Sequence, residues 1–129
     1  MPRAVVEPGD VLDEVAGEVE EDRPGQAEDR EVTTIEGVGK PGQLHPVQQA
    51  MIRSGGIQCG FCTPGMVLSI KGLLDRNPQP DEAAVRWSLE GNLCRCTGYI
   101  KIYEAVELAA ARLRGEELEL PREAIYGRE

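Results

Sequence analysis

The four cysteines of this 129-residue chain lie in two pairs. Cys59 and Cys62 belong to the stretch IQCGFCTPGM, and Cys94 and Cys96 belong to the stretch NLCRCTGY. A threonine and a segment with a helical pattern follow each pair. A cysteine just before a helix lies near unpaired N–H groups and the positive end of the helix dipole, which lowers the pKa of its thiol. Because the thiolate is the form that binds metals, this arrangement predicts a metal or redox site built from all four sulfurs.

Ligand chemistry alone leaves two kinds of site open. Four thiolates suit either a tetrahedral zinc ion or an iron–sulfur cluster. Zinc ribbons usually carry two Cys-x-x-Cys pairs, whereas a single residue, Arg95, separates the cysteines of the second pair. A [2Fe-2S] cluster takes two thiolates on each of its two irons, and amides at helix starts stabilise its negative charge. The spacing therefore favours the cluster, with a structural zinc module that mediates protein contacts as the alternative.

The negative charge of the chain is concentrated in its N-terminal segment. Residues 1–31 contain 11 Asp and Glu against 3 Arg, while the formal net charge of the whole chain is −9. This composition predicts an acidic, mostly irregular tail. No basic stripe that could replace phosphate counterions is visible, so nucleic acid is not an expected partner.

The sequence predicts neither a membrane span nor a secretory signal. A spanning helix needs roughly 18 or more apolar residues in a row, and no stretch approaches that length. The acidic start also lacks the basic and apolar regions of a signal peptide. We therefore expect a cytoplasmic protein without a membrane span. Disulfides are rare in a reducing compartment, so this location also favours metal or redox chemistry at the cysteines.

The rest of the sequence predicts helices. Apolar residues make up 40% of the chain but aromatic residues only 4%, which favours helices over a β-sandwich. Thr63, Asp81 and Thr97 are expected to cap helices. The β-branched segment VTTIEG at 32–37 is expected to be extended. The expected helices run over residues 44–54 and 63–76, from Asp81 to Gly91, and over residues 99–114.

The order helix, glycine, cysteine pair, threonine, helix occurs twice. Gly56 and Gly91 are 35 residues apart, and the second cysteines of the two pairs are 34 residues apart. Two such helical hairpins can pack as a pseudo-symmetric four-helix bundle, in which each hairpin covers the apolar face of the other. We therefore expect an all-α domain at residues 32–114 with both cysteine pairs at one end, followed by a polar tail at residues 115–129.

A set of motifs extends the pattern beyond the cysteines. It consists of QCGFCTPGM, GNLCRCTGY, the 31 residues between Cys62 and Cys94, and the segments VTTIEG and LHPVQQA. This set resembles the iron–sulfur subunit of the molybdenum hydroxylases, the family of xanthine dehydrogenase, aldehyde oxidoreductase and aerobic carbon monoxide dehydrogenase. The likeness runs from about Glu31 to Arg112.

The resemblance implies that the chain is an electron-transfer subunit. A single [2Fe-2S] cluster would take electrons from a molybdopterin cofactor in a separate large subunit. The electrons would then pass toward a second cluster and toward FAD on an FAD-binding subunit. The implied cluster ligands are Cys59, Cys62, Cys94 and Cys96. The resemblance also implies that Gln58 contacts the pterin and that Cys96 lies close to it.

Substrate chemistry is not expected on this chain alone. The sequence contains no recognisable nucleophile with a base, carboxylate pair or phosphate-binding loop. The chain also departs from the family before VTTIEG, where family members carry a plant-type ferredoxin domain with the second cluster. Here residues 1–31 occupy that place and contain no cysteine. Three explanations are open: a separate ferredoxin-like chain supplies the module, the sequence is truncated or its start misread, or the chain is a degenerate copy.

Overall fold

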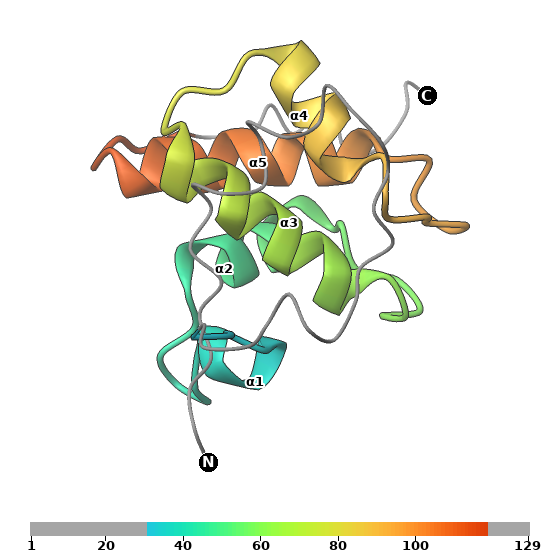
Figure 1. The fold of residues 1–129 in the computed structure, drawn as a ribbon, viewed down its shortest axis with the longest axis horizontal. Coiled ribbons are helices and arrows are strands. Elements are labelled where there is room, and N and C mark those ends of the chain that lie inside the picture. The colour runs from blue at the N-terminus through green and yellow to red at the C-terminus, as the bar shows by residue number, and fades with distance from the viewer. Residues whose placement is uncertain (1–30, 119–129) are drawn as a thin grey trace, which may run out of the picture.

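A computed structural model of the protein describes residues 31–118 (Figure 1). Within these residues the chain forms α1 (Ile35–Val38), α2 (Pro46–Ser54), α3 (Thr63–Arg76), α4 (Glu82–Leu89) and α5 (Ile100–Leu113). The described part of the chain contains no strand longer than an isolated bridge between Lys40 and Gln43. The predicted all-α class is therefore confirmed. The expected acidic tail lies almost entirely outside the described residues, and the division of the chain at residues 31 and 114 stays a prediction.

The closest helix pairs join the two halves of the repeat. α2 packs most extensively against α5, and α3 packs most extensively against α4 (Figure 1). α3 also contacts α2 and α5, so it lies at the centre of the helical arrangement. The first half of the repeat, α2 and α3, therefore packs chiefly against the second half, α4 and α5. This packing connects the α2–α3 loop with the α4–α5 loop.

The core follows the helical period of the sequence. On α5 the buried residues Ile102, Ala105, Val106 and Ala109 recur at spacings of three and four, which places them on one face. The two alanines allow α2 to approach α5 closely, since helix separation depends on the size of the side chains at the contact. Among the described residues, no helix is both long and apolar enough to cross a membrane.

Side chains cap two of the described helices, α2 and α4. Asp81 caps α4 as predicted, because its Oδ1 accepts from the Ala84 N–H at 2.8 Å. His45 caps α2, and its Nδ1 accepts from the Val47 N–H at 3.2 Å. Burial lowers the pKa of His45, which favours the neutral imidazole that this hydrogen bond needs. Thr63 was expected to cap α3, but this prediction is wrong, because Thr63 is the first helical residue and caps nothing. Thr97 was expected to cap α5, but this prediction is also wrong, because Tyr99 is the N-cap residue and no side chain caps that helix.

The prediction of an extended segment at residues 32–37 is also wrong over its second half. Ile35–Val38 forms a single helical turn, in which the Gly37 N–H donates to the Thr34 carbonyl at 2.9 Å. Ile35 and Val38 pack against the core. β-branched residues favour extended backbone only weakly, and here the packing of two partly buried side chains outweighs that preference.

Candidate metal centre

Two loops at the same end of the molecule carry the cysteines. One loop joins α2 to α3 and the other joins α4 to α5, and both lie at the right of Figure 1. Cys62 and Cys94 lie close enough to shift the pKa of each other, and Cys59 lies close enough to shift the pKa of Cys96. All four cysteines are free thiols. Each contact therefore joins one cysteine of the first pair to one of the second.

The loop after Cys94 closes on itself through hydrogen bonds. The Cys94 N–H donates to the Tyr99 hydroxyl oxygen at 3.0 Å, and the Tyr99 N–H donates to Thr97 Oγ1 at 3.1 Å. Thr97 Oγ1 and Cys94 Sγ are 3.1 Å apart, and the Thr97 N–H points at the same sulfur at 3.5 Å. Tyr99 is the single non-glycine residue with a positive φ, 71°, in the described chain. This uncommon backbone conformation turns the chain sharply from the cysteine loop into α5.

The pKa values of the thiols differ, and the helix dipole does not explain the differences. The side-chain and backbone hydrogen bonds of Thr97 lower the pKa of Cys94 to about 7. Burial, followed by the hydrogen bond with Cys94, raises the pKa of Cys62, although Cys62 caps α3. The hydrogen bond with Cys59 raises the pKa of Cys96. The expectation of a lowered pKa at each helix start is therefore wrong for Cys62 and Cys96, because contacts between neighbouring thiols and burial outweigh the dipole.

This difference predicts the order in which the thiols of the metal-free chain react. A thiol with a lowered pKa becomes thiolate as the pH rises through that pKa, and only the thiolate is alkylated rapidly. Alkylation of Cys94 by iodoacetamide is expected to have a midpoint near pH 7. Cys62 in the same sample serves as the internal control, with a midpoint above that of an ordinary thiol at about 8.5. Mass spectrometry of the digested chain measures both, and equal midpoints would refute the assignment.

Asn92 braces the second cysteine loop against α3. Its Nδ2 donates to Ser69 Oγ at 2.7 Å, a contact that spans 23 residues of sequence. Its Oδ1 lies where a Cβ on Gly65 would have to be. Gly65 therefore leaves room for the asparagine, and the asparagine holds the loop that leads to Cys94 in place. This role of Asn92 could not be predicted, because nothing in the sequence indicates that it reaches the hydroxyl of Ser69.

Two glycines of α3 provide a matched test of this brace. In the Gly65→Ala variant the new methyl group displaces Asn92 and breaks its bond to Ser69, at a cost of about 1–2 kcal/mol. Gly72→Ala adds the same methyl group to the same helix where nothing lies within 4 Å. That change should stabilise the helix by about 0.5–1 kcal/mol. Chemical denaturation of both variants measures the difference. Equal free energies of unfolding would show that the contact between Asn92 and Ser69 does not contribute to stability.

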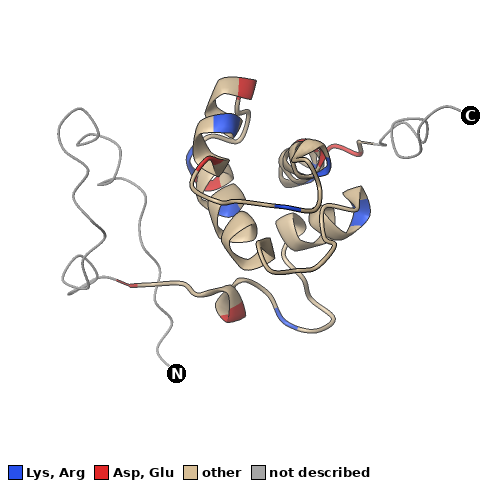
Figure 2. Cartoon of the chain, turned by 90° about the vertical axis from the view of Figure 1, so that its right-hand side faces the viewer, with Lys and Arg blue, Asp and Glu red and all other residues tan. Residues whose placement is uncertain are grey.

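The cysteine end of the molecule exposes apolar side chains. Phe61 is 94% exposed and Leu93 is 84% exposed. Phe61 therefore does not shield the cysteines from water in the chain by itself. Gln58, the predicted pterin contact, is also exposed and lies next to the exposed Cys59. Figure 2 views this side, where the two loops carry almost no charged residue apart from Arg95.

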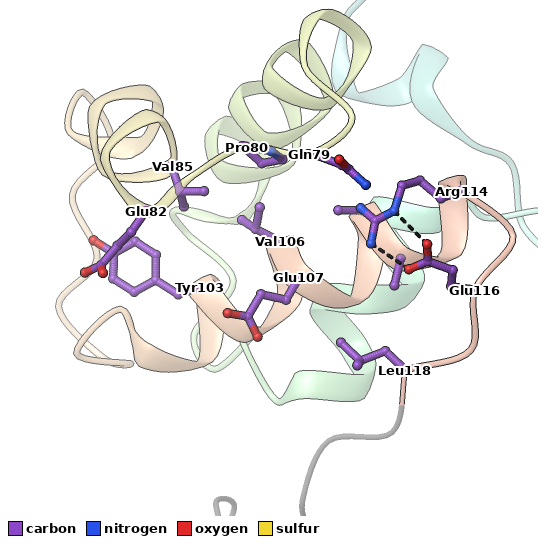
Figure 3. Close-up of a pocket in the computed structure, with 12 residues that line it drawn as sticks. Gln79, Pro80, Glu82, Val85, Tyr103, Val106, Glu107, Arg114, Glu116 and Leu118 are labelled. Carbon is purple, nitrogen blue, oxygen red and sulfur yellow. Dashed lines mark hydrogen bonds and ion pairs between the residues drawn. The ribbon is translucent and has the colours of Figure 1, made fainter.

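A groove of about 600 Å³ lies elsewhere, between α4, α5 and the segment after α5 (Figure 3). Val85 and Val106 form part of its apolar surface, and Glu107 lies at its edge. Arg114 closes one end by pairing with Glu116. No cysteine or histidine is among the described residues that line the groove, so it is separate from the cysteine site.

The described residues contain no three Cys, His, Asp or Glu side chains that converge on one metal ion. The two loops bring the thiols together as two pairs, Cys62 with Cys94 and Cys59 with Cys96. The fold and these pairs define a helical domain with a thiol-rich site at one end.

Comparison with known proteins identifies the family. Residues 34–107 match the [2Fe-2S] binding domain family. The chain is 49% identical over 88 residues to the nicotinate dehydrogenase small FeS subunit of Eubacterium barkeri. That alignment covers 68% of this chain and 56% of the relative. The aldehyde oxidoreductase of Megalodesulfovibrio gigas is 50% identical over 95 residues, which are 72% of this chain and 10% of that protein. The chain belongs to the [2Fe-2S] binding domain family, which confirms the predicted cofactor class.

Solved structures agree with this assignment. The aldehyde oxidoreductase of Desulfovibrio desulfuricans superposes with a TM-score of 0.63 and 47% identity over 70% of this chain and 11% of that one. Quinoline 2-oxidoreductase from Pseudomonas putida superposes with a TM-score of 0.61 and 41% identity, over 71% of this chain and 59% of that one. The chain thus spans about half or less of the relatives that it matches.

Proposed function

We propose that the chain is the [2Fe-2S] electron-transfer subunit of a molybdopterin-dependent hydroxylase complex. The observation that carries the proposal is that two cysteine pairs from two halves of a repeat meet at one end of the fold. The relatives in which this domain occurs are named as dehydrogenases and oxidoreductases, and one of them is a small FeS subunit. The chain would relay electrons and perform no substrate chemistry.

The proposed ligands are Cys59, Cys62, Cys94 and Cys96. In a [2Fe-2S] cluster each iron takes two protein thiolates, whereas a structural zinc ion takes four donors around one point. The two thiol contacts, with no three donors around one point in the described chain, suit two irons better than one zinc ion. We therefore assign Cys62 and Cys94 to one iron and Cys59 and Cys96 to the other.

A neighbouring hydroxyl supports the fit of this site to a cluster. Thr63 Oγ1 is buried and has no hydrogen-bond partner, and Thr63 directly follows Cys62. A buried hydroxyl without a partner costs free energy, so such groups usually have an acceptor. The sulfurs of a bound cluster would supply acceptors beside Cys62. When bound, the cluster would supply reversible one-electron redox chemistry.

The residues of the chain would bind this centre, influence its reduction potential and orient it. Cys94 and Cys62 are half-buried, so the domain covers one side of the site, while Cys59 and Cys96 lie on the exposed side. Electrons would enter or leave through that exposed side, because electron transfer between proteins needs a short path through the surface. Gln58 lies on the same side, which is consistent with its proposed contact with the pterin.

The exposed apolar end is the proposed contact with the large molybdopterin-binding subunit. Apolar side chains as exposed as Phe61 and Leu93 lose contact with water when a partner covers them, and aromatic residues are enriched at such interfaces. An FAD-binding subunit completes the proposed complex. A cytoplasmic location stays part of this proposal.

Co-expression tests the proposal. Expressed with a molybdopterin-binding subunit encoded in the same genome, the chain should co-purify with it in equal amounts. Nicotinate, quinoline and an aldehyde are then added anaerobically, and one of them should bleach the visible absorption of the iron–sulfur chromophore. A chain that carries zinc without sulfide, or one that does not co-purify with the large subunit, would contradict the proposal.

A further inference from the structure

The hydroxyl group of Thr97 lies between a backbone donor and a proposed ligand. Its Oγ1 accepts from the Tyr99 N–H at 3.1 Å and lies 3.1 Å from Cys94 Sγ. Because the oxygen already accepts one hydrogen bond, its own proton is available for the sulfur. A metal-bound cysteine is a thiolate and can only accept. The geometry therefore makes Thr97 the donor and Cys94 the acceptor.

We propose that Thr97 raises the reduction potential of the iron–sulfur centre by donating its hydroxyl proton to Cys94 Sγ. This inference rests on the proposed function, since it requires a cluster bound to Cys94. Reduction adds negative charge that is shared with the sulfurs, so a donor at a sulfur stabilises the reduced state more than the oxidised state. Hydrogen bonds to the sulfurs are one of the factors that set the potential of such centres.

The two halves of the repeat differ at this point. Thr63 holds the position after Cys62 that Thr97 holds after Cys96, yet Thr63 Oγ1 has no partner within the described chain. Thr97, in contrast, is held by the Tyr99 N–H. Thr97 and Cys94 are half-buried, so water cannot freely replace the hydroxyl. The donor at Cys94 Sγ would therefore act on the iron that Cys62 and Cys94 are proposed to share, and the two threonines differ in that only Thr97 is held in place by a hydrogen bond within the described chain.

A purely structural role for Thr97 makes a different prediction. Thr97 also closes the loop by accepting from Tyr99, so its loss could simply loosen the chain. Thr97→Ser keeps the hydroxyl and both hydrogen bonds, whereas Thr97→Val keeps the shape and loses the donor. Tyr99→Phe removes the acceptor of the Cys94 N–H but leaves the Thr97 hydroxyl in place. This last variant controls for a loosened loop.

The test is an anaerobic redox titration of the full chain loaded with iron and sulfide, followed by visible absorption and EPR. A hydrogen bond of about 1 kcal/mol corresponds to about a fivefold change in the reduction equilibrium. At 59 mV per tenfold, Thr97→Val should lower the potential by about 40 mV. Thr97→Ser should leave it unchanged. The Thr97 backbone N–H also points at Cys94 Sγ and exchanges in every variant. Pulsed EPR in D₂O should therefore show one exchangeable deuteron fewer near the centre in Thr97→Val than in the wild type and in Thr97→Ser.

Iron and sulfide content distinguishes a failure of the proposed function from a failure of the role proposed for Thr97. If the wild type binds no cluster, the proposed function itself fails. If all variants hold the cluster and Thr97→Val has the wild-type potential, only the role of Thr97 is overturned. A shift as large in Tyr99→Phe as in Thr97→Val would also overturn it, because loop rigidity would then be the cause. Thr97→Ala repeats the test without the bulk of valine. If neither it nor Thr97→Val loads the cluster while Thr97→Ser does, Thr97 acts in assembly and the inference is wrong.

Discussion

Replacement of Cys94 by alanine is expected to abolish cluster binding, with iron falling from about two atoms per chain to near zero. The proposed pairing leaves one iron with the single thiolate of Cys62, and no other Cys, His, Asp or Glu among the described residues joins that site. This variant also removes the thiol whose pKa the hydrogen bonds of Thr97 lower to about 7. Metal analysis and visible absorption of the reconstituted variant measure the effect.

Arg95→Ala is the matched control for Cys94→Ala. Arg95 lies in the same loop between the two cysteines, is exposed and contributes no sulfur. This variant should bind the same amount of iron and sulfide as the wild type. Because cluster binding and folding are coupled in small sites, Cys94→Ala should also be digested faster by proteases than Arg95→Ala under loading conditions. Full iron content in Cys94→Ala would disprove the ligand assignment.

Truncation of Phe61 is expected to weaken the proposed complex with the large subunit by about ten- to a hundredfold. The side chain is 94% exposed in the chain by itself. Burial of an aromatic side chain contributes roughly 1.5–3 kcal/mol, and each 1.4 kcal/mol is tenfold in the dissociation constant. Phe61→Ala should therefore reduce co-purification of the large subunit and raise the dissociation constant, while the iron content of the chain stays at the wild-type value.

Leu113→Ala provides the control on a different surface. Leu113 is 44% exposed and ends α5, the helix that Ile100 begins beside the cysteine loop. A helix of 14 residues is about 20 Å long, so Leu113 lies well away from the cysteine end. Its truncation should leave the dissociation constant unchanged. Equal weakening by both variants would place the interface elsewhere or show a general loss of stability.

The longer helices could be predicted from the sequence because local signals agree with the packing. The apolar positions of α3 and α5 recur with helical spacing, and the predicted ranges differ from the observed bounds by no more than one residue at an end. The Asp81 cap is a local hydrogen bond, and it was predicted from residue type alone. The meeting of the two cysteine pairs was expected from the repeat, since two equivalent hairpins place equivalent loops at the same end.

Features that depend on distant contacts could not be predicted. The turn at Ile35–Val38 depends on packing against the core, which a β-branched sequence does not reveal. The acidity of Cys94 depends on a threonine three residues later, whose rotamer is fixed by the turn at Tyr99. The raised pKa of Cys62 depends on burial and on a thiol 32 residues away. Spacing predicts the four proposed ligands, but it does not indicate that the pKa of Cys94 is lowered while that of Cys62 is raised.

Iron and acid-labile sulfide analysis of the full chain, reconstituted anaerobically, tests the central claim most directly. If the two cysteine pairs hold one [2Fe-2S] cluster, the chain binds about two irons and two sulfides and gives an EPR signal after reduction by dithionite. About one zinc ion per chain without sulfide would contradict the account, because a single tetrahedral ion would then hold all four thiolates.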